Sequence, residues 1–561
     1  MTPVKKPAIK IAETSGYHSP DSSSSRSSTM QVVSPTILQG TADFPAMDNN
    51  DSKINLNVNS SLEVDRILLK MVCKDYHPFG IVEKEGFKRL IQALNPNYKL
   101  PTKKTLSNRL LNKYYYEVRS FVIEEINTAQ AICITTEGWT SVNNDSFIDI
   151  TAHFINEENI SKSYFLDCVQ YAKDNTASNL TTSLQSVFET WDIQNKIVVI
   201  VSDNTPNLRN AVRLGCWESI GCFAQKVNVF LQDALGIRNL DENNATPNTI
   251  AEIISKVKII VQYYRNTAQA KKKLMEVAKN IGIAKFKLKQ GSPMSWNNTY
   301  EMLDQFLKLK ECIISSLSML RDDLLPSQHE WEVIERAMPI LKLFYDVTTD
   351  ICTEKLTLSK TPFYYQFMMN HIMEQDQMYF TEGIPGEISQ LICNLKAEFA
   401  KLQDPETDMI TSEATILDPR FRNLAFKKPE NYEWALKHLK GKLISQQSYT
   451  FSPKILSIWD DLDLEYALSL PENTTAPGIL ELEKYMQEEY LPREKDPLEW
   501  WEKNKNTYPH LYKYMKIRLC VQASSVPCDQ IFARAGHVRD KNRCRLGLSK
   551  LNKLLFLHYN M

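Results

Sequence analysis

The sequence contains no uninterrupted run of about 18 apolar residues, the length that a helix needs to cross a bilayer. Its first residues also lack the positively charged and then apolar pattern of a secretory signal. We therefore expect a soluble intracellular protein with no membrane partner. The length of 561 residues, 43% of them hydrophobic, is sufficient for several domains with apolar cores.

Paired cysteine spacing is also missing. The eleven cysteines are scattered, which argues against a disulfide framework and against a complete zinc finger. The formal net charge is only −1, so any contact with nucleic acid must come from local basic patches rather than from the field of the whole molecule. No repeat of fixed period is present.

The composition and the predicted secondary structure change along the chain. Residues 1–60 are rich in Ser, Thr, Pro and Asn and cannot bury enough apolar surface to offset the entropy of ordering, so we expect a disordered tail. Helical spacing starts near Leu62, which predicts a small helical module at 61–128. From 237 to 480 the pattern is again overwhelmingly helical.

Residues 129–236 predict an α/β core. Three segments rich in Ile, Phe, Val, Thr and Tyr, at 131–137, 147–155 and 163–170, have the spacing of hairpin-linked strands. After a helical stretch, the segment 196–204 is a near-continuous apolar run, which is typical of a central strand covered on both faces. A further helix and a short strand follow, giving a mixed arrangement of α and β elements.

Two of the predicted strands end in an acid, Glu137 after the first strand and Asp203 after the fourth. In a sheet with the order 3-2-1-4-5 these strands are neighbours, so the two carboxylates would lie side by side. Mg²⁺ is bound through one or two carboxylates together with substrate phosphate, and a third acid would complete such a site. Alternatively, Glu137 only ends a strand before a Gly-Trp turn, and Asp203 caps the following helix.

Seven stretches of the chain carry a resemblance to a known family. In order they are KDYHPFGIVEKEGFKRLIQALNPNYKLP (74–101), TTEGWTS (135–141), VSDNTPNLRNAV (201–212), CFAQKVNVFLQDAL (222–235), WNNTYEML (296–303), ATILDPRF (414–421) and ASSVPCDQIFARAGHVRDKNRCRLGLSKLNKLLFL (523–557). They resemble the hAT transposase superfamily, in the branch that includes the BED-finger proteins. The resemblance implies an RNase H-like core interrupted by a long helical insertion, with a region at 481–561 that completes the core and mediates dimerisation.

In that family the metal-binding acids are Asp, Asp and Glu, and the resemblance carries these roles to Glu137, Asp203 and Asp529. The first and third identities are exchanged here, and Mg²⁺ tolerates such shifts poorly because it requires near-ideal octahedral geometry. A family His is replaced by Gln225, a family Arg by Ser295, and the BED finger is absent. These departures favour a protein without strand-transfer chemistry and without a cofactor; a triad that is still competent would use Mg²⁺ or Mn²⁺.

The resemblance also implies contacts with DNA. Trp296 corresponds to a family tryptophan associated with stacking on a base near the cleaved end, and a place in the core is the alternative. Residues 103–119 lie where the family has additional DNA-binding helices, and a solvated helical face is the alternative. The basic residues that we expect to contact DNA there are Lys103, Lys104, Arg109 and Lys113.

The C-terminal tail combines charge with an apolar stripe. After Asp529 it carries seven basic residues against one acidic residue, interleaved with leucines, a pattern that suits either packing against a partner subunit or contact with phosphate. The resemblance favours packing. Asp529 could also be merely a favourable acid in the first turn of a helix. The residues expected to mediate dimerisation, some of which could also close the core, are Trp500, Trp501, Phe532, Leu551 and Leu555.

Three hypotheses follow from the sequence. The preferred one is a non-catalytic nuclear protein derived from an hAT transposase, which forms a homodimer and associates with DNA or chromatin. The second is an active metal-dependent DNA transposase that uses Glu137, Asp203 and Asp529. The third is a protein-interaction scaffold that has lost DNA binding together with the finger. The basic stretch at 103–119 supports the first hypothesis, and the missing finger supports the third.

Overall fold

The computed structural model describes most of the chain from residue 61 onward. The described ranges are 61–140, 146–171, 176–238, 249–283, 286, 288–289, 295–352, 357–382, 386–445, 462, 465–466, 469–470, 476–525 and 547–561. The expectation of a disordered tail at 1–60, and the roles expected of Asp529 and Phe532, lie outside these residues. None of the helices in the described ranges combines the length and the apolar character that crossing a membrane requires.

The N-terminal module, residues 61–128, consists of helices. The longest, α3, carries an apolar stripe at spacings of three and four residues, so one face of the helix is buried. The elements are α1 (Ser61–Lys74), η1 (Phe79–Glu83), α2 (Glu85–Leu94), the π-helical turn η2 (Thr105–Leu110) and α3 (Leu111–Thr128).

A five-stranded mixed sheet follows, with the strand order β3-β2-β1-β4-β5. This confirms the order on which the sequence argument for neighbouring acids rested. β1 pairs with β2 in the antiparallel sense and with β4 in the parallel sense. The strands are β1 (Ile132–Thr140), β2 (Ser146–Ile155), β3 (Ser161–Tyr171), β4 (Ile197–Ser202) and β5 (Ser219–Gly221); the intervening helices are α4 (Ala177–Thr190), η3 (Gln194–Lys196) and α5 (Pro206–Leu214).

The sheet lies between two apolar clusters, because successive side chains of a strand point to opposite faces. The first apolar cluster contains Cys133 and Val199 together with Trp296 from the helical region. The second contains Ile134 and Ile200 together with residues of the N-terminal module. Every residue of β4 is buried, as the apolar run in its sequence predicts for a strand covered on both faces.

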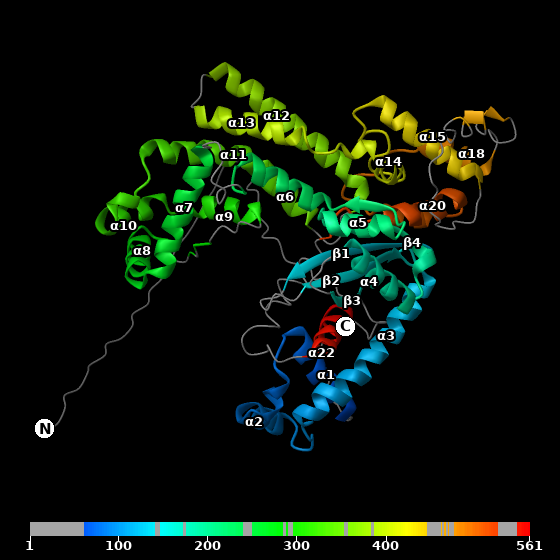
Figure 1. Cartoon of the computed structure of the whole chain (residues 1–561), viewed down its shortest axis with the longest axis horizontal. Helices are drawn as coiled ribbons and strands as arrows, with labels where there is room; N and C mark the ends of the chain where they lie inside the picture. The colour runs from blue at the N-terminus through cyan, green and yellow to red at the C-terminus, as the bar shows by residue number, and fades with distance from the viewer. Residues whose placement is uncertain are drawn as a thin grey trace, which may run out of the picture. The chain divides into compact units, whose positions relative to one another are not determined.

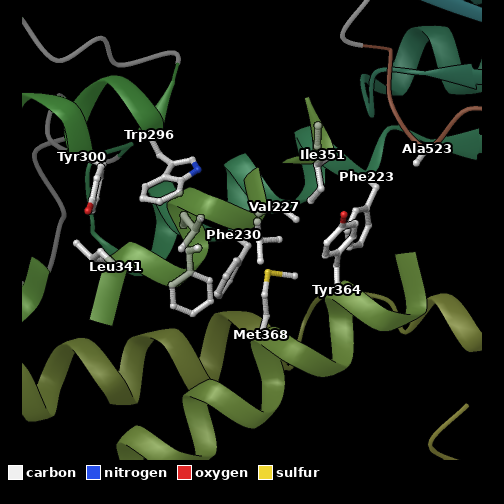
Figure 2. Close-up of a cluster of buried hydrophobic side chains, with 14 of the residues drawn as sticks. Phe223, Val227, Phe230, Trp296, Tyr300, Leu341, Ile351, Tyr364, Met368 and Ala523 are labelled. Atoms are coloured by element: carbon white, nitrogen blue, oxygen red, sulfur yellow. The ribbon is translucent and has the colours of Figure 1, made fainter. Parts of the chain in front are cut away.

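Helices make up the region after the sheet (Figure 1). Apart from α22, which packs on the second apolar cluster, they pack on the first, parts of which are drawn in Figure 2. Their bounds are α6 (Phe223–Ala234), α7 (Thr249–Asn266), α8 (Ala268–Asn280), α9 (Trp296–Lys308), α10 (Lys310–Leu320), η4 (Asp322–Leu324), α11 (Gln328–Ile351), η5 (Leu358–Lys360), α12 (Thr361–Glu382), α13 (Gly386–Phe399), η6 (Pro405–Thr407), α14 (Met409–Ile416), α15 (Pro429–Ser445), α18 (Pro477–Met486), α19 (Pro497–Asn504), α20 (Pro509–Leu519) and α22 (Leu548–Asn560).

A buried ionic cluster connects the helical region to the C-terminal region. Glu413 of α14 has no exposed surface, and its carboxylate accepts hydrogen bonds from Arg518 Nε at 2.6 Å, Lys442 Nζ at 2.6 Å and the Tyr514 hydroxyl at 2.8 Å. Burial alone would raise the pKa of Glu413, but the charges of Arg518 and Lys442 outweigh burial and lower it to about 2. The carboxylate therefore stays ionised between α14, α15 and α20.

The C-terminal helix α22 covers the free edge of the sheet along β3 (Figure 1). The Asn560 side chain accepts from Phe165 N at 3.0 Å and donates to Phe165 O at 2.7 Å, as a neighbouring strand would. Asn552 Oδ1 accepts from Cys168 N at 3.2 Å. Side-chain amides thus satisfy backbone groups that a bare edge strand would present to other chains.

Replacing Glu413 should test the ionic cluster. Glu413→Gln leaves the buried Arg518 guanidinium without its counter-charge, so we expect the free energy of unfolding to fall by about 3 to 5 kcal/mol in urea titrations. The matched control is Glu483→Gln, because Glu483 forms an exposed ion pair with Lys440. This control should change stability by less than about 1 kcal/mol. Equal effects of the two substitutions would contradict a stabilising role for the buried cluster.

Candidate functional site

Glu137 and Asp203 occupy neighbouring positions at one edge of the sheet. The parallel pairing of β1 with β4 ends at Thr136 and Ser202, and each acid is the next residue on its strand. Glu137 is half-buried, whereas Asp203 is only 8% exposed. The register therefore places the two acids as the sequence argument expected.

The local setting of Glu137 differs from the expectation that it ends a strand. β1 continues through Gly138 and Trp139 to Thr140, because the antiparallel pairing with β2 extends beyond the point where β4 stops. Glu137 is therefore the first residue past the β4 pairing and lies in the interior of the β1–β2 hairpin. The expectation that the strand ends at Glu137 is therefore wrong.

Asp203 forms a local turn and is not a helix cap. Its Oδ1 accepts hydrogen bonds from Thr205 N at 3.2 Å and from the Thr205 hydroxyl at 2.6 Å, which is the pattern of an Asx turn. Helix α5 begins at Pro206 and its N-cap residue is Thr205. One oxygen of the Asp203 carboxylate is thus committed to holding the strand-to-helix connection.

A third acid, Asp149 of β2, stands directly opposite Glu137 in the β1–β2 register. It has no exposed surface, and its Oδ1 accepts a hydrogen bond from Trp139 Nε1 at 3.3 Å. Burial raises the pKa of Asp149 to about 7, although hydrogen bonds from Cys168 and Trp139 act in the opposite direction. The sequence analysis missed Asp149; its only signal was a lone acid within the apolar segment FIDITAHFI.

A buried histidine lies on the same face of the sheet, further along the strands from Glu137. His153 of β2 lies between the Thr135 hydroxyl, 2.8 Å from Nε2, and the Ser163 hydroxyl, 2.8 Å from Nδ1. Burial lowers the pKa of His153 to about 3, so the ring is neutral at physiological pH. Both ring nitrogens of the neutral histidine are hydrogen-bonded, which satisfies a buried polar side chain in the core.

The described residues do not form a complete metal site. No group of three His, Cys, Asp or Glu side chains within them is arranged to hold a metal ion. Asp149 is protonated over much of the range below neutral pH, and an Asp203 oxygen accepts from Thr205. The third acid implied by the resemblance, Asp529, lies outside the described residues.

Trp296 lies in the core of the helical region. Figure 2 shows its indole beside Tyr300 and above Phe230, and none of its surface is exposed. The indole Nε1 donates to Thr348 Oγ1 at 3.2 Å. Neither face of the ring is open to a DNA base in this structure, which corresponds to the core alternative.

Four residues expected at a dimer interface pack within their own chain. Trp501 is fully buried and donates from Nε1 to Leu417 O at 2.9 Å, while Trp500 stacks on Tyr508. Leu551 and Leu555 are buried in the second apolar cluster. These side chains stabilise the C-terminal region, which is the core-closing alternative for the two tryptophans.

The basic residues expected to contact DNA are on the surface. Lys103, Lys104, Arg109 and Lys113 are all exposed. Lys113 Nζ lies 3.8 Å from Glu117 Oε1 one helical turn further along α3. Such an exposed pair contributes little to stability and leaves the lysine able to meet another anion.

The buried Asp149 makes stability depend on pH. Its pKa is raised from 3.8 to about 7 in the folded protein, so its stabilising contribution is present below about pH 4 and lost as the pH rises through 7. The loss amounts to at most about 4 kcal/mol. We expect Asp149→Asn to flatten the fall in unfolding free energy between about pH 4 and 8, measured by urea titration. The exposed Asp322→Asn should keep the wild-type profile; parallel profiles for wild type and Asp149→Asn would contradict the assignment.

Comparison with known proteins assigns about half of the chain to known domain families. Residues 135–214 match the ZBED1 RNase-like domain, residues 220–339 match the ZBED1 RNase-like helical domain, and residues 481–561 match the hAT family C-terminal dimerisation region. The chain therefore contains these regions, and the resemblance seen in the sequence is confirmed.

Similar proteins support the same assignment. Zinc finger BED domain-containing protein 4 of Homo sapiens is 23% identical over 98% of this chain and 47% of its own length. Zinc finger BED domain-containing protein 6 of Homo sapiens is 21% identical over 89% and 55%, and the Putative AC transposase of Zea mays is 22% identical over 93% and 68%. The chain spans about half the length of the two human relatives. Its homologues are BED-finger hAT transposase-derived proteins.

Proposed function

We propose that this chain, which carries ZBED1 RNase-like domains and an hAT dimerisation region, is a transposase-derived nuclear protein that forms a homodimer and binds DNA without strand transfer. The observation that carries the proposal is the exposed basic stretch of the N-terminal module in a chain whose acid site is altered. Binding to the DNA backbone needs only positive charge on the surface, whereas strand transfer needs an intact metal site.

DNA binding is supported by the position of the basic residues. Lys103 and Lys104 precede η2, and Arg109 and Lys113 follow within η2 and α3, so four cations lie within three helical turns. All four side chains are exposed, and the ion pair of Lys113 with Glu117 is exposed as well. Phosphate contacts by lysine and arginine give affinity without sequence preference, which is what association with chromatin requires.

Loss of strand transfer is supported by the surroundings of the acids. Glu replaces the family Asp at position 137, and the buried Asp149 faces it across the hairpin with a pKa near neutrality. Asp203 also holds the turn before α5. A Mg²⁺ ion would need octahedral oxygen geometry from a longer first side chain, and this geometry is what the exchange of Glu and Asp disturbs.

Self-association is supported by the match of residues 481–561 to the hAT dimerisation region. In our proposal, Trp501, Leu551 and Leu555 maintain the shape of this region from within. The contacts between subunits then fall to residues on its surface and to those beyond the described ranges.

The absence of strand transfer is tested by activity on DNA. We expect no cleavage or strand transfer on hairpin and nicked-end DNA with Mg²⁺ or Mn²⁺, either for wild type or for Asp203→Ala. Asp203→Ala serves as the control because it removes one of the two acids at the β1–β4 edge. Wild-type activity that disappears in Asp203→Ala would show an active transposase and overturn this part of the proposal.

DNA binding is tested by charge removal in the basic stretch. Arg109→Gln with Lys113→Gln should weaken binding to duplex DNA and lower the slope of log affinity against log salt by about 0.9 per lost phosphate contact. Fluorescence anisotropy over a salt series measures both. The control, Lys271→Gln with Lys272→Gln, removes the same charge from exposed positions on α8. Equal losses in the two variants would point to overall charge, and absence of binding by wild type would overturn the proposed DNA association.

A further inference from the structure

Two lysines of the C-terminal helix lie against the basic stretch of the N-terminal module. Lys550 Nζ is 3.5 Å from the Ser107 hydroxyl, and Lys553 Nζ donates to Asn112 Oδ1 at 2.7 Å. Lys553 Nζ also lies 5.2 Å from the ring centre of Tyr115 and 5.6 Å from that of Tyr116. Residues more than 400 positions apart in the sequence therefore share one surface.

Helical geometry extends this surface along α3. Positions three and four apart share a face of a helix, so Asn112 and Tyr116 lie next to the stripe that contains Arg109 and Lys113. Tyr116 is 59% exposed although Lys553 approaches its ring. On α22, Lys550 and Lys553 are three positions apart and lie on one face, while Leu551, Leu554 and Leu555 turn into the second apolar cluster.

The acidic groups near this surface are few and mostly engaged. Glu117 of α3 is 3.8 Å from Lys113. Asp167 of β3 is bound by the Asn552 side chain and by Cys168 N. Asp65 of α1 accepts a hydrogen bond from the Tyr98 hydroxyl at 2.5 Å. Positive charge therefore exceeds negative charge where α22 meets η2 and α3.

We propose that α22 supplies part of the DNA-binding surface, with Lys550 and Lys553 contacting the phosphate backbone of duplex DNA alongside Arg109 and Lys113. This inference rests on the proposed DNA association and adds a second element to it. Phosphates are the ligand that fits, because lysine presents a point charge with three donors, which suits the phosphate oxygens of the DNA backbone. In this proposal, the exposed aromatic ring of Tyr116 packs against the sugar–phosphate backbone.

In this arrangement, a helix of the dimerisation region contributes to DNA binding. α22 belongs to residues 481–561, and it reaches the basic stretch only while its leucines are docked on α1, α3 and the edge of β3. The amide contacts of Asn552 and Asn560 with β3 hold it in this register. The complete basic surface is therefore formed only in the folded assembly of N-terminal module, sheet and C-terminal helix.

The experiment uses the full chain and duplex DNA of random sequence. It compares, between variants, the slope of log affinity against log salt concentration. Lys550→Gln with Lys553→Gln should lower the slope by about 1.8, since each lost phosphate contact accounts for about 0.9. The charge-conserving pair, Lys550→Arg with Lys553→Arg, should keep the wild-type slope. Thermal unfolding of each variant shows whether α22 remains docked, and Lys271→Gln with Lys272→Gln is again the matched charge control.

The outcomes separate this inference from the proposed function. An unchanged slope for the α22 glutamine variant, together with a reduced slope for Arg109→Gln with Lys113→Gln, overturns the inference and leaves DNA association standing. Equal losses for the arginine and glutamine variants would assign the effect to packing and also overturn the inference. Absence of DNA binding by the wild-type protein would remove the proposed function itself.

Discussion

The parallel pairing of β1 with β4 is the contact on which the rest of the structure depends. It joins a hairpin meander, β1 to β3, to a strand that arrives through the crossover helix α4. Parallel strands in the middle of a sheet must be covered on both faces, since neither face can be left to water without exposing apolar side chains. The two apolar clusters provide this cover, one from the helical region and one from the N-terminal module and α22.

This packing on the two faces of the sheet explains why some residues of the C-terminal region are buried and others lie on its surface. Glu413 with Arg518 connects α14 to α20, and the asparagine side chains of α22 satisfy the edge of β3. Trp501, Leu551 and Leu555, which resemble interface anchors, are buried within the chain. Lys550 and Lys553 of α22 are partly exposed and lie beside the basic stretch of the N-terminal module.

Glu137 and Asp203 lie where the parallel pairing of β1 with β4 stops. The buried Asp149 stands opposite Glu137 across the β1–β2 hairpin, and burial raises the pKa of Asp149 to about 7. A neutral carboxyl accommodates burial at a lower cost than a charged one, and it weakens the negative potential that a divalent cation needs. The RNase-like fold is thus compatible with a role in binding.

The sequence by itself indicated the strand segments, the acids Glu137 and Asp203 that follow two of them, and the helical regions on either side, because apolar periodicity and isolated acids are visible in short segments. It also located the exposed basic residues from Lys103 to Lys113. The pairing that makes β1 and β4 neighbours was confirmed only by the tertiary structure. The tertiary structure alone decided that Asp149 faces Glu137, that Trp296 is enclosed, and that Lys550 and Lys553 meet α3. The reason is physical: burial, pKa and contact between residues hundreds of positions apart depend on how the elements pack, which no single segment encodes.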